Sequence, residues 1–165
     1  MIVILHNIRS LHNVGSIFRT ADAAGVKKIY LTGITPAPLD RLGKPRPQLT
    51  KVSLGAENNI SWDSSANSPR AVRRLLDKLR NEKFKIYAIE QSKKSMPYYK
   101  LNLNGKRPSD IALVLGNEVK GIPKSILNLS DKILEIPMAG KKESLNVSVA
   151  FGIVAFHFIA KNVRQ

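Results

Sequence analysis

Short runs of mostly apolar residues alternate along the chain with segments whose apolar residues recur every three or four positions. Five such runs predict β-strands, at Ile2–Leu5, Lys28–Thr32, Phe84–Ile89, Ile111–Leu115 and Ile133–Ile136. Because most of these runs do not alternate between apolar and polar residues, they indicate strands covered on both faces, as in a parallel sheet.

Segments in which apolar residues have helical spacing lie between the predicted strands and after the last one. We expect Asn13 to cap a first helix and Gly25 to end it. Ser68 and Pro69 suit the cap and first turn of a second helix, whose inward positions are Val72, Leu75, Leu76 and Leu79. A third helix, over about residues 146–161, is apolar almost all round. The alternation predicts an α/β fold with a parallel sheet.

Length and composition narrow the class of protein. A chain of 165 residues predicts one domain over 1–165, with no second domain at either end. The proline-rich stretch 35–47 predicts a surface loop. The chain has no cysteine, which excludes disulfides and thiolate metal sites, and we expect no metal. Its longest apolar stretch, 149–160, is too short to span a bilayer, and its first apolar run is too short for a signal peptide, so we expect a cytoplasmic protein.

The charge is the unusual feature of the composition. The chain carries 27 Lys and Arg against 12 Asp and Glu, a net charge of +15. A domain this basic repels itself unless it binds a polyanion, and nucleic acid is the usual one, with an anionic membrane second. Cationic residues gather on the second helix and just after the third strand, and we expect RNA contacts from Arg70, Arg73, Arg74, Lys78, Lys93 and Lys94. For any one of these residues taken alone, a solvated surface charge is the better interpretation, and the RNA contact is favoured only for the cluster as a whole.

Three motifs follow predicted strands. The first, Asn13–Ala21, places Arg19 in a mostly apolar helix, where it needs an anion or an acidic partner. The second, Leu115–Gly121, has two glycines that allow a tight loop beyond the carboxyl end of a strand, where ligands of α/β sheets bind. It matches neither a Walker loop nor a GxGxxG loop. The third runs through Ile136–Gly140 and Ser144–Ala150, with Ser144 as the expected helix cap.

Together the three motifs resemble those of the SpoU/TrmH branch of the SPOUT RNA methyltransferases. The family patterns Asn-x-Gly-x-x-x-Arg-Thr-Ala, Leu-x-Leu-Gly-x-Glu-x-x-Gly and Ile-Pro-Met…Ser-Leu-Asn-Val-Ser-x-Ala occur in order. The resemblance implies a C-terminal trefoil knot, a homodimer, and transfer of a methyl group from S-adenosylmethionine to a ribose 2′-hydroxyl of tRNA or, second, rRNA. By motif position, the cofactor pocket would be lined by Leu115, Gly116, Asn117, Gly121, Ile136, Met138, Ser144 and Leu145.

The resemblance also implies catalytic roles, with Arg19 at the centre and four residues around it: Asn13, Glu118, Ser144 and Asn146. Arg19 would act as a general base or, since a guanidinium is essentially always protonated, as an electrostatic clamp on a phosphate and the developing alkoxide. Two other functions stay open. One is a non-catalytic RNA-binding or ribosome-associated protein, and the other is a SPOUT enzyme that methylates a base.

Overall fold

The structure, a computed structural model, describes residues 1–103, 105 and 107–163. Seven strands form one parallel sheet in the order β3-β2-β1-β6-β4-β7-β5. Their bounds are β1 Ile2–His6, β2 Lys28–Thr32, β3 Ser61–Asp63, β4 Lys85–Ile89, β5 Met96–Pro97, β6 Ile111–Leu115 and β7 Lys132–Glu135. The helices are α1 Leu11–Ala23, α2 Pro47–Ser53, α3 Ala56–Asn59, α4 Pro69–Asn81, α5 Lys124–Leu127 and α6 Val147–Val163, with 3-10 turns at Tyr98–Lys100 and Pro108–Asp110.

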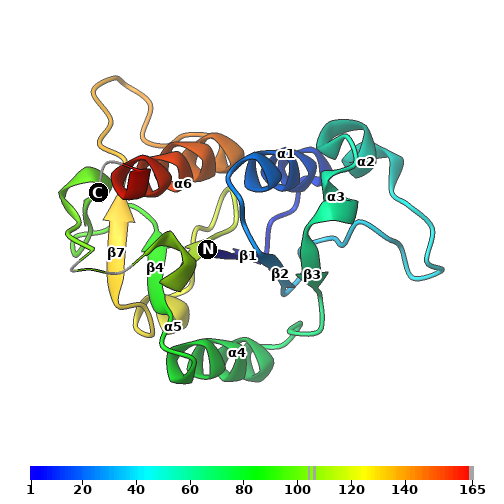
Figure 1. The fold of residues 1–165 in the computed structure, drawn as a ribbon, viewed down its shortest axis with the longest axis horizontal. Helices are drawn as coiled ribbons and strands as arrows, with labels where there is room; N and C mark the ends of the chain where they lie inside the picture. The colour runs from blue at the N-terminus through cyan, green and yellow to red at the C-terminus, as the bar shows by residue number, and fades with distance from the viewer. Residues whose placement is uncertain (104, 106, 164–165) are drawn as a thin grey trace.

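Helices cover both faces of the sheet, which gives three layers (Figure 1). Successive side chains of β1 point to opposite faces: Val3 and Leu5 pack with α1 and α6, whereas Ile2 and Ile4 pack with α4 and α5. All residues of β1 and β6 are buried, as strands enclosed on both faces require. The predicted parallel α/β fold is therefore confirmed, and the five predicted strands agree with the observed ones to within one residue at each end.

Two predicted helix caps are wrong by a few residues. The hydroxyl of Ser10, not Asn13, caps α1 by accepting the Asn13 N–H at 3.2 Å, which leaves the Asn13 side chain free for other contacts. The last helix begins at Val147, and its cap is Asn146, not Ser144, since the Asn146 side chain accepts the Ser148 N–H at 2.8 Å. In both cases several polar residues lie close together, and any of them could act as the cap.

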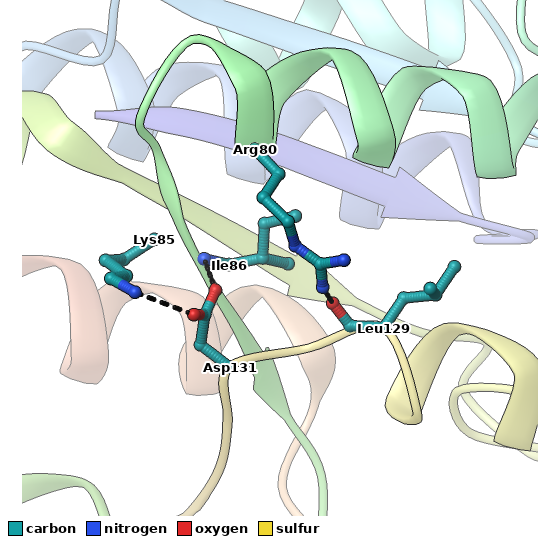
Figure 2. Close-up of polar contacts among 5 residues, drawn as sticks. All are labelled: Arg80, Lys85, Ile86, Leu129 and Asp131. Carbon is teal, nitrogen blue, oxygen red and sulfur yellow. Dashed lines mark hydrogen bonds and ion pairs between the residues drawn. The ribbon is translucent and has the colours of Figure 1, made fainter.

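At the amino-terminal ends of the strands, Asp131, which lies just before β7, links neighbouring segments (Figure 2). Its carboxylate accepts the Ile86 N–H at 2.9 Å and pairs with Lys85 at 2.9 Å. Arg80 at the end of α4 donates to the carbonyl of Leu129. These contacts fix the end of α4 and the start of β4 to the segment that leads into β7.

Candidate active site

The second motif forms a tight turn beyond β6, which we call the glycine loop (residues 116–122). Asn117 organises it: the side-chain oxygen accepts the N–H groups of Val119 and Lys120, and the backbone oxygen accepts the Gly121 N–H at 2.9 Å. The Asn117 side-chain amide donates to the carbonyl of Asn7 at 2.7 Å. The loop is thereby closed on itself and attached to the end of β1.

The two glycines of this loop are required by its own packing. A Cβ at Gly116 would come within 2.5 Å of Ile122 Cγ1 and 2.6 Å of the Gly121 carbonyl carbon. Gly121 has a φ of +66°, and a Cβ there would also collide with the carboxylate of Glu90. The glycines thus allow the loop to fold back on β4 and leave its backbone at the rim of a pocket.

Glu90, immediately after β4, holds the far side of the glycine loop. Its Oε2 accepts the Ile122 N–H at 2.8 Å, and its Oε1 accepts the Gln91 N–H at 3.0 Å. The motifs do not include this residue, so sequence reasoning missed it. An acidic residue directly after a predicted strand, at the edge where ligands bind, was the available signal.

Glu118 connects the glycine loop to the first motif. Its carboxylate accepts the N–H groups of Arg9 and Ser10 at 3.1 to 3.3 Å and the Asn13 side-chain amide at 3.0 Å. Partial burial acts to raise the pKa of this carboxyl, but hydrogen bonds from the backbone of Glu118 and Arg9, from Asn13 and from the Ser10 backbone outweigh it, and the pKa lies below its usual value. Glu118 is therefore ionised at neutral pH and orients Asn13.

Asn146 completes a hydrogen-bonded chain across all three motifs. Its side-chain amide donates to the Asn13 side-chain oxygen at 2.9 Å, while its own oxygen accepts from the Ser148 hydroxyl at 2.7 Å. Asn13 thus donates to Glu118 and accepts from Asn146, which fixes the orientation of both amides. Residues more than 100 positions apart in the sequence form this arrangement.

A pocket of about 490 Å³ opens beside the hydrogen-bonded side chains of Glu118, Asn13 and Asn146, at the carboxyl ends of β4, β6 and β7. The structure brings together there all the residues expected at the cofactor: Leu115, Gly116, Asn117, Gly121, Ile136, Met138, Ser144 and Leu145. Four of the five expected catalytic residues also line it: Asn13, Glu118, Ser144 and Asn146. Further lining residues that the motifs did not indicate include Ile89, Glu90, Gln91 and Glu135. Their contacts with a ligand stay predictions.

Arg19 is the expected residue that does not line the pocket. It lies on the exposed side of α1, and the described part of the chain offers it no hydrogen-bond or ion-pair partner. Gly15 of the same motif has a packing role instead, because a Cβ there would lie 2.5 Å from the Leu49 carbonyl oxygen of α2. The first motif thus serves the pocket through Asn13 and the packing of α1 on α2 through Gly15.

The residues expected to contact RNA are all exposed: Arg70, Arg73, Arg74, Lys78, Lys93 and Lys94. Two of them pair along α4, Arg73 with Asp77 and Lys78 with Glu82, each at 3.8 Å. α4 follows β3 and leads to the start of β4. Arg70 and Arg74 form no ion pair with the described residues.

Within the described ranges, no helix has both the length and the apolarity needed to cross a bilayer, and no group of three His, Cys, Asp or Glu side chains is placed to hold a metal ion. The fold is a parallel α/β sheet with a pocket at its carboxyl edge, which is the usual location for nucleotide-like ligands.

The chain belongs to the SpoU rRNA methylase family, whose sequence profile matches residues 1–156. It is 31% identical over 159 residues to the 23S rRNA (guanosine-2′-O-)-methyltransferase RlmB of Xylella fastidiosa, covering 96% of this chain and 58% of that protein. It is 32% identical to the tRNA (guanosine(18)-2′-O)-methyltransferase of Aquifex aeolicus, covering 94% of this chain and 67% of that one. A crystal structure of an AdoMet-bound rRNA methyltransferase from Sinorhizobium meliloti superposes with a TM-score of 0.78 at 28% identity, covering 97% of this chain and 56% of that chain.

Proposed function

We propose that this protein transfers a methyl group from S-adenosylmethionine to a ribose 2′-hydroxyl of tRNA or rRNA. The observation that carries the proposal is the convergence of all three motifs on one pocket, joined by the hydrogen-bonded chain of Glu118, Asn13 and Asn146. The names of the relatives support both RNA classes, and the net charge of +15 supports RNA as partner.

The pocket residues fit S-adenosylmethionine. Apolar side chains of Leu115, Ile136, Met138 and Leu145 offer a surface for a nucleoside base, and the glycine loop offers backbone groups. The titratable side chains among the lining residues are carboxylates, which suit a ligand with a positively charged sulfur. When bound there, S-adenosylmethionine supplies an activated methyl group.

The residues around the pocket divide the remaining work. Glu118 holds Asn13, and Asn13 and Asn146 hold each other, so these amides are oriented before RNA arrives. We assign to them and to Ser144 the positioning of the target nucleotide. Arg19 would act on the ribose hydroxyl as base, or stabilise the developing alkoxide and hold a phosphate as a fixed cation.

The position of Arg19 favours a homodimer. Because Arg19 does not line the pocket of its own chain, we infer that it reaches the pocket of a second copy. Val149 and Phe156 are 49% and 46% exposed on α6, seven residues apart and thus on one side of the helix, and they provide an apolar surface for that contact. With the family we also propose the trefoil knot, a cytoplasmic location and a single domain over 1–165.

For RNA binding we propose a surface that runs from the first turns of α4 to Lys93 and Lys94. Arg70 and Arg74 are its central cations, since the neighbouring Arg73 and Lys78 already have acidic partners. Replacing both with alanine should weaken RNA binding. It should also reduce, by about 2, the steepness with which the logarithm of the RNA-binding constant falls against the logarithm of the salt concentration. A matched pair of changes at Lys27 and Lys132, which lie at the amino-terminal ends of β2 and β7, should have a smaller effect on the slope.

The test of the activity has two stages. Calorimetry should show binding of S-adenosylmethionine, and incubation with tRNA and rRNA transcripts should give a 2′-O-methylated nucleoside that mass spectrometry identifies. Arg19→Ala should keep cofactor binding and lose transfer, whereas Arg41→Ala, in the loop between β2 and α2, should keep both. Absence of cofactor binding would instead favour a non-catalytic RNA-binding protein, and a methyl group on a base would favour the base-methylating alternative.

A further inference from the structure

We propose that three carboxylates make this pocket selective for the cationic methyl donor over its neutral product. The inference rests on the proposed function and concerns the same pocket. Among the described residues that line it, the acidic side chains are Glu90, Glu118 and Glu135, and there is no Lys or Arg. A local negative charge of this kind stands out in a protein of net charge +15.

The fold places the three carboxylates side by side. Glu118 follows β6, Glu90 follows β4, and Glu135 ends β7, and these three strands are consecutive neighbours in the sheet. Because the strands are parallel, their carboxyl ends meet at one edge. The three acids are therefore brought to the pocket by the order of the strands.

None of these acids is neutralised by a basic side chain among the described residues. Glu90 and Glu118 accept N–H groups, and Glu135 accepts the Ser95 hydroxyl at 2.6 Å. The ion pairs of the described residues all lie elsewhere and involve Asp63, Asp77, Glu82, Asp110 and Asp131. The hydrogen bonds hold the three carboxylates in place and leave their negative charge to act on a ligand.

Methyl transfer changes the charge of the ligand that these carboxylates face. The methyl carbon leaves sulfur, whose bonding electron pair stays on sulfur as the sulfonium becomes a thioether. The carbon forms a new bond to the ribose oxygen, and the hydroxyl proton passes to solvent. The ligand loses one positive charge, so the attraction to the three carboxylates is lost when the product forms, which favours its release.

The test compares three ligands by calorimetry: S-adenosylmethionine, its analogue sinefungin, which carries an ammonium group near the position of the sulfur, and the neutral S-adenosylhomocysteine. The wild type should bind the two cations more tightly than it binds S-adenosylhomocysteine. In Glu135→Gln the affinity for both cations should fall severalfold, because one negative charge that faces the ligand is removed, while the affinity for the neutral ligand should change little. This substitution is mild because the Ser95 hydroxyl can still donate to an amide oxygen.

Glu82→Gln, at the far end of α4, is the matched control and should change none of the three affinities. Equal binding of all three ligands by the wild type, or an equal loss for all three in Glu135→Gln, would overturn the inference and leave the proposed function intact. If no ligand binds at all, the proposed function itself fails. Should the variant not fold, the preference of the wild type for the cations must decrease with added salt, and a constant preference refutes the proposal.

Discussion

Gly121 and Glu90 provide a direct test of how the pocket is built. Gly121→Ala introduces a side chain at a φ of +66°, which costs about 1 to 2 kcal/mol. Its Cβ also displaces the Glu90 carboxylate from the Ile122 N–H, which adds about 1 to 2 kcal/mol. We therefore expect Gly121→Ala to lower the free energy of unfolding by about 2 to 4 kcal/mol.

A double-mutant cycle separates the two causes. Glu90→Ala should cost about 1 to 2 kcal/mol, because it leaves the same N–H without its acceptor. In the Glu90→Ala background, Gly121→Ala should cost only the backbone strain, so the two changes together should fall short of their sum by about 1 to 2 kcal/mol. Gly25→Ala is the control, since Gly25 has a φ of +64° with nothing within 4 Å of an added Cβ.

Urea unfolding followed by far-UV circular dichroism and by the fluorescence of Trp62 measures these free energies. The Gly25→Ala variant should show the strain alone, and calorimetry should show loss of S-adenosylmethionine binding only in the variants at positions 90 and 121. Additive effects of the two substitutions would refute the proposed contact between Glu90 and the loop. The same conclusion would follow if Gly121→Ala cost no more than Gly25→Ala.

Three further changes test other parts of the structure. Burial lowers the pKa of His6, so the unfolded chain takes up the proton more readily, and the free energy of unfolding should fall as the pH drops below about 6.5. His6→Asn should flatten this pH dependence, measured by urea titrations between pH 7 and 5. An unchanged pH dependence in the variant would contradict the role given to His6. Asp131→Ala should cost about 1 to 3 kcal/mol because a backbone N–H loses its acceptor, whereas Lys85→Ala, in the exposed pair, should cost less than about 1; equal losses would contradict this division. Gly15→Ala should lower the thermal midpoint, since the added methyl meets the Leu49 carbonyl of α2, and an unchanged midpoint would rule out that contact.

The central strands and main helices could be predicted from the sequence because their residues contact the core in a regular pattern. Lys28–Thr32 and Ile111–Leu115 are bounded as predicted, since apolar runs and buried strands coincide there. The short strand Ser61–Asp63 lies at the sheet edge, and its exposed or half-buried residues give no apolar run. Helices α2 and α3 have seven and four residues, too few for a helical period to stand out.

The pocket shows a similar division. Motif positions predicted residues that do line it, because most of those residues lie at or just after the ends of β6 and β7. Glu90 and Glu135 were missed because they lie outside the three motifs, and a single acid at a strand end is only a weak signal in one sequence. The exchange of caps from Asn13 to Ser10 could not be predicted from spacing, since both are polar residues near the start of α1 and either could act as the cap.

The central place of β1 in the sheet has a consequence for how the chain folds during synthesis. β1 pairs with β2 on one side, but its other partner, β6, begins at Ile111. While the first hundred residues emerge, one edge of this mostly apolar strand stays unpaired, and the N–H groups of Arg9 and Ser10, just before α1, lack the Glu118 carboxylate that accepts them. Parallel pairings over such separations close slowly. The nascent chain therefore passes through a period in which β1 is open to wrong partners, and a chaperone that shields this edge should raise the yield of folded protein.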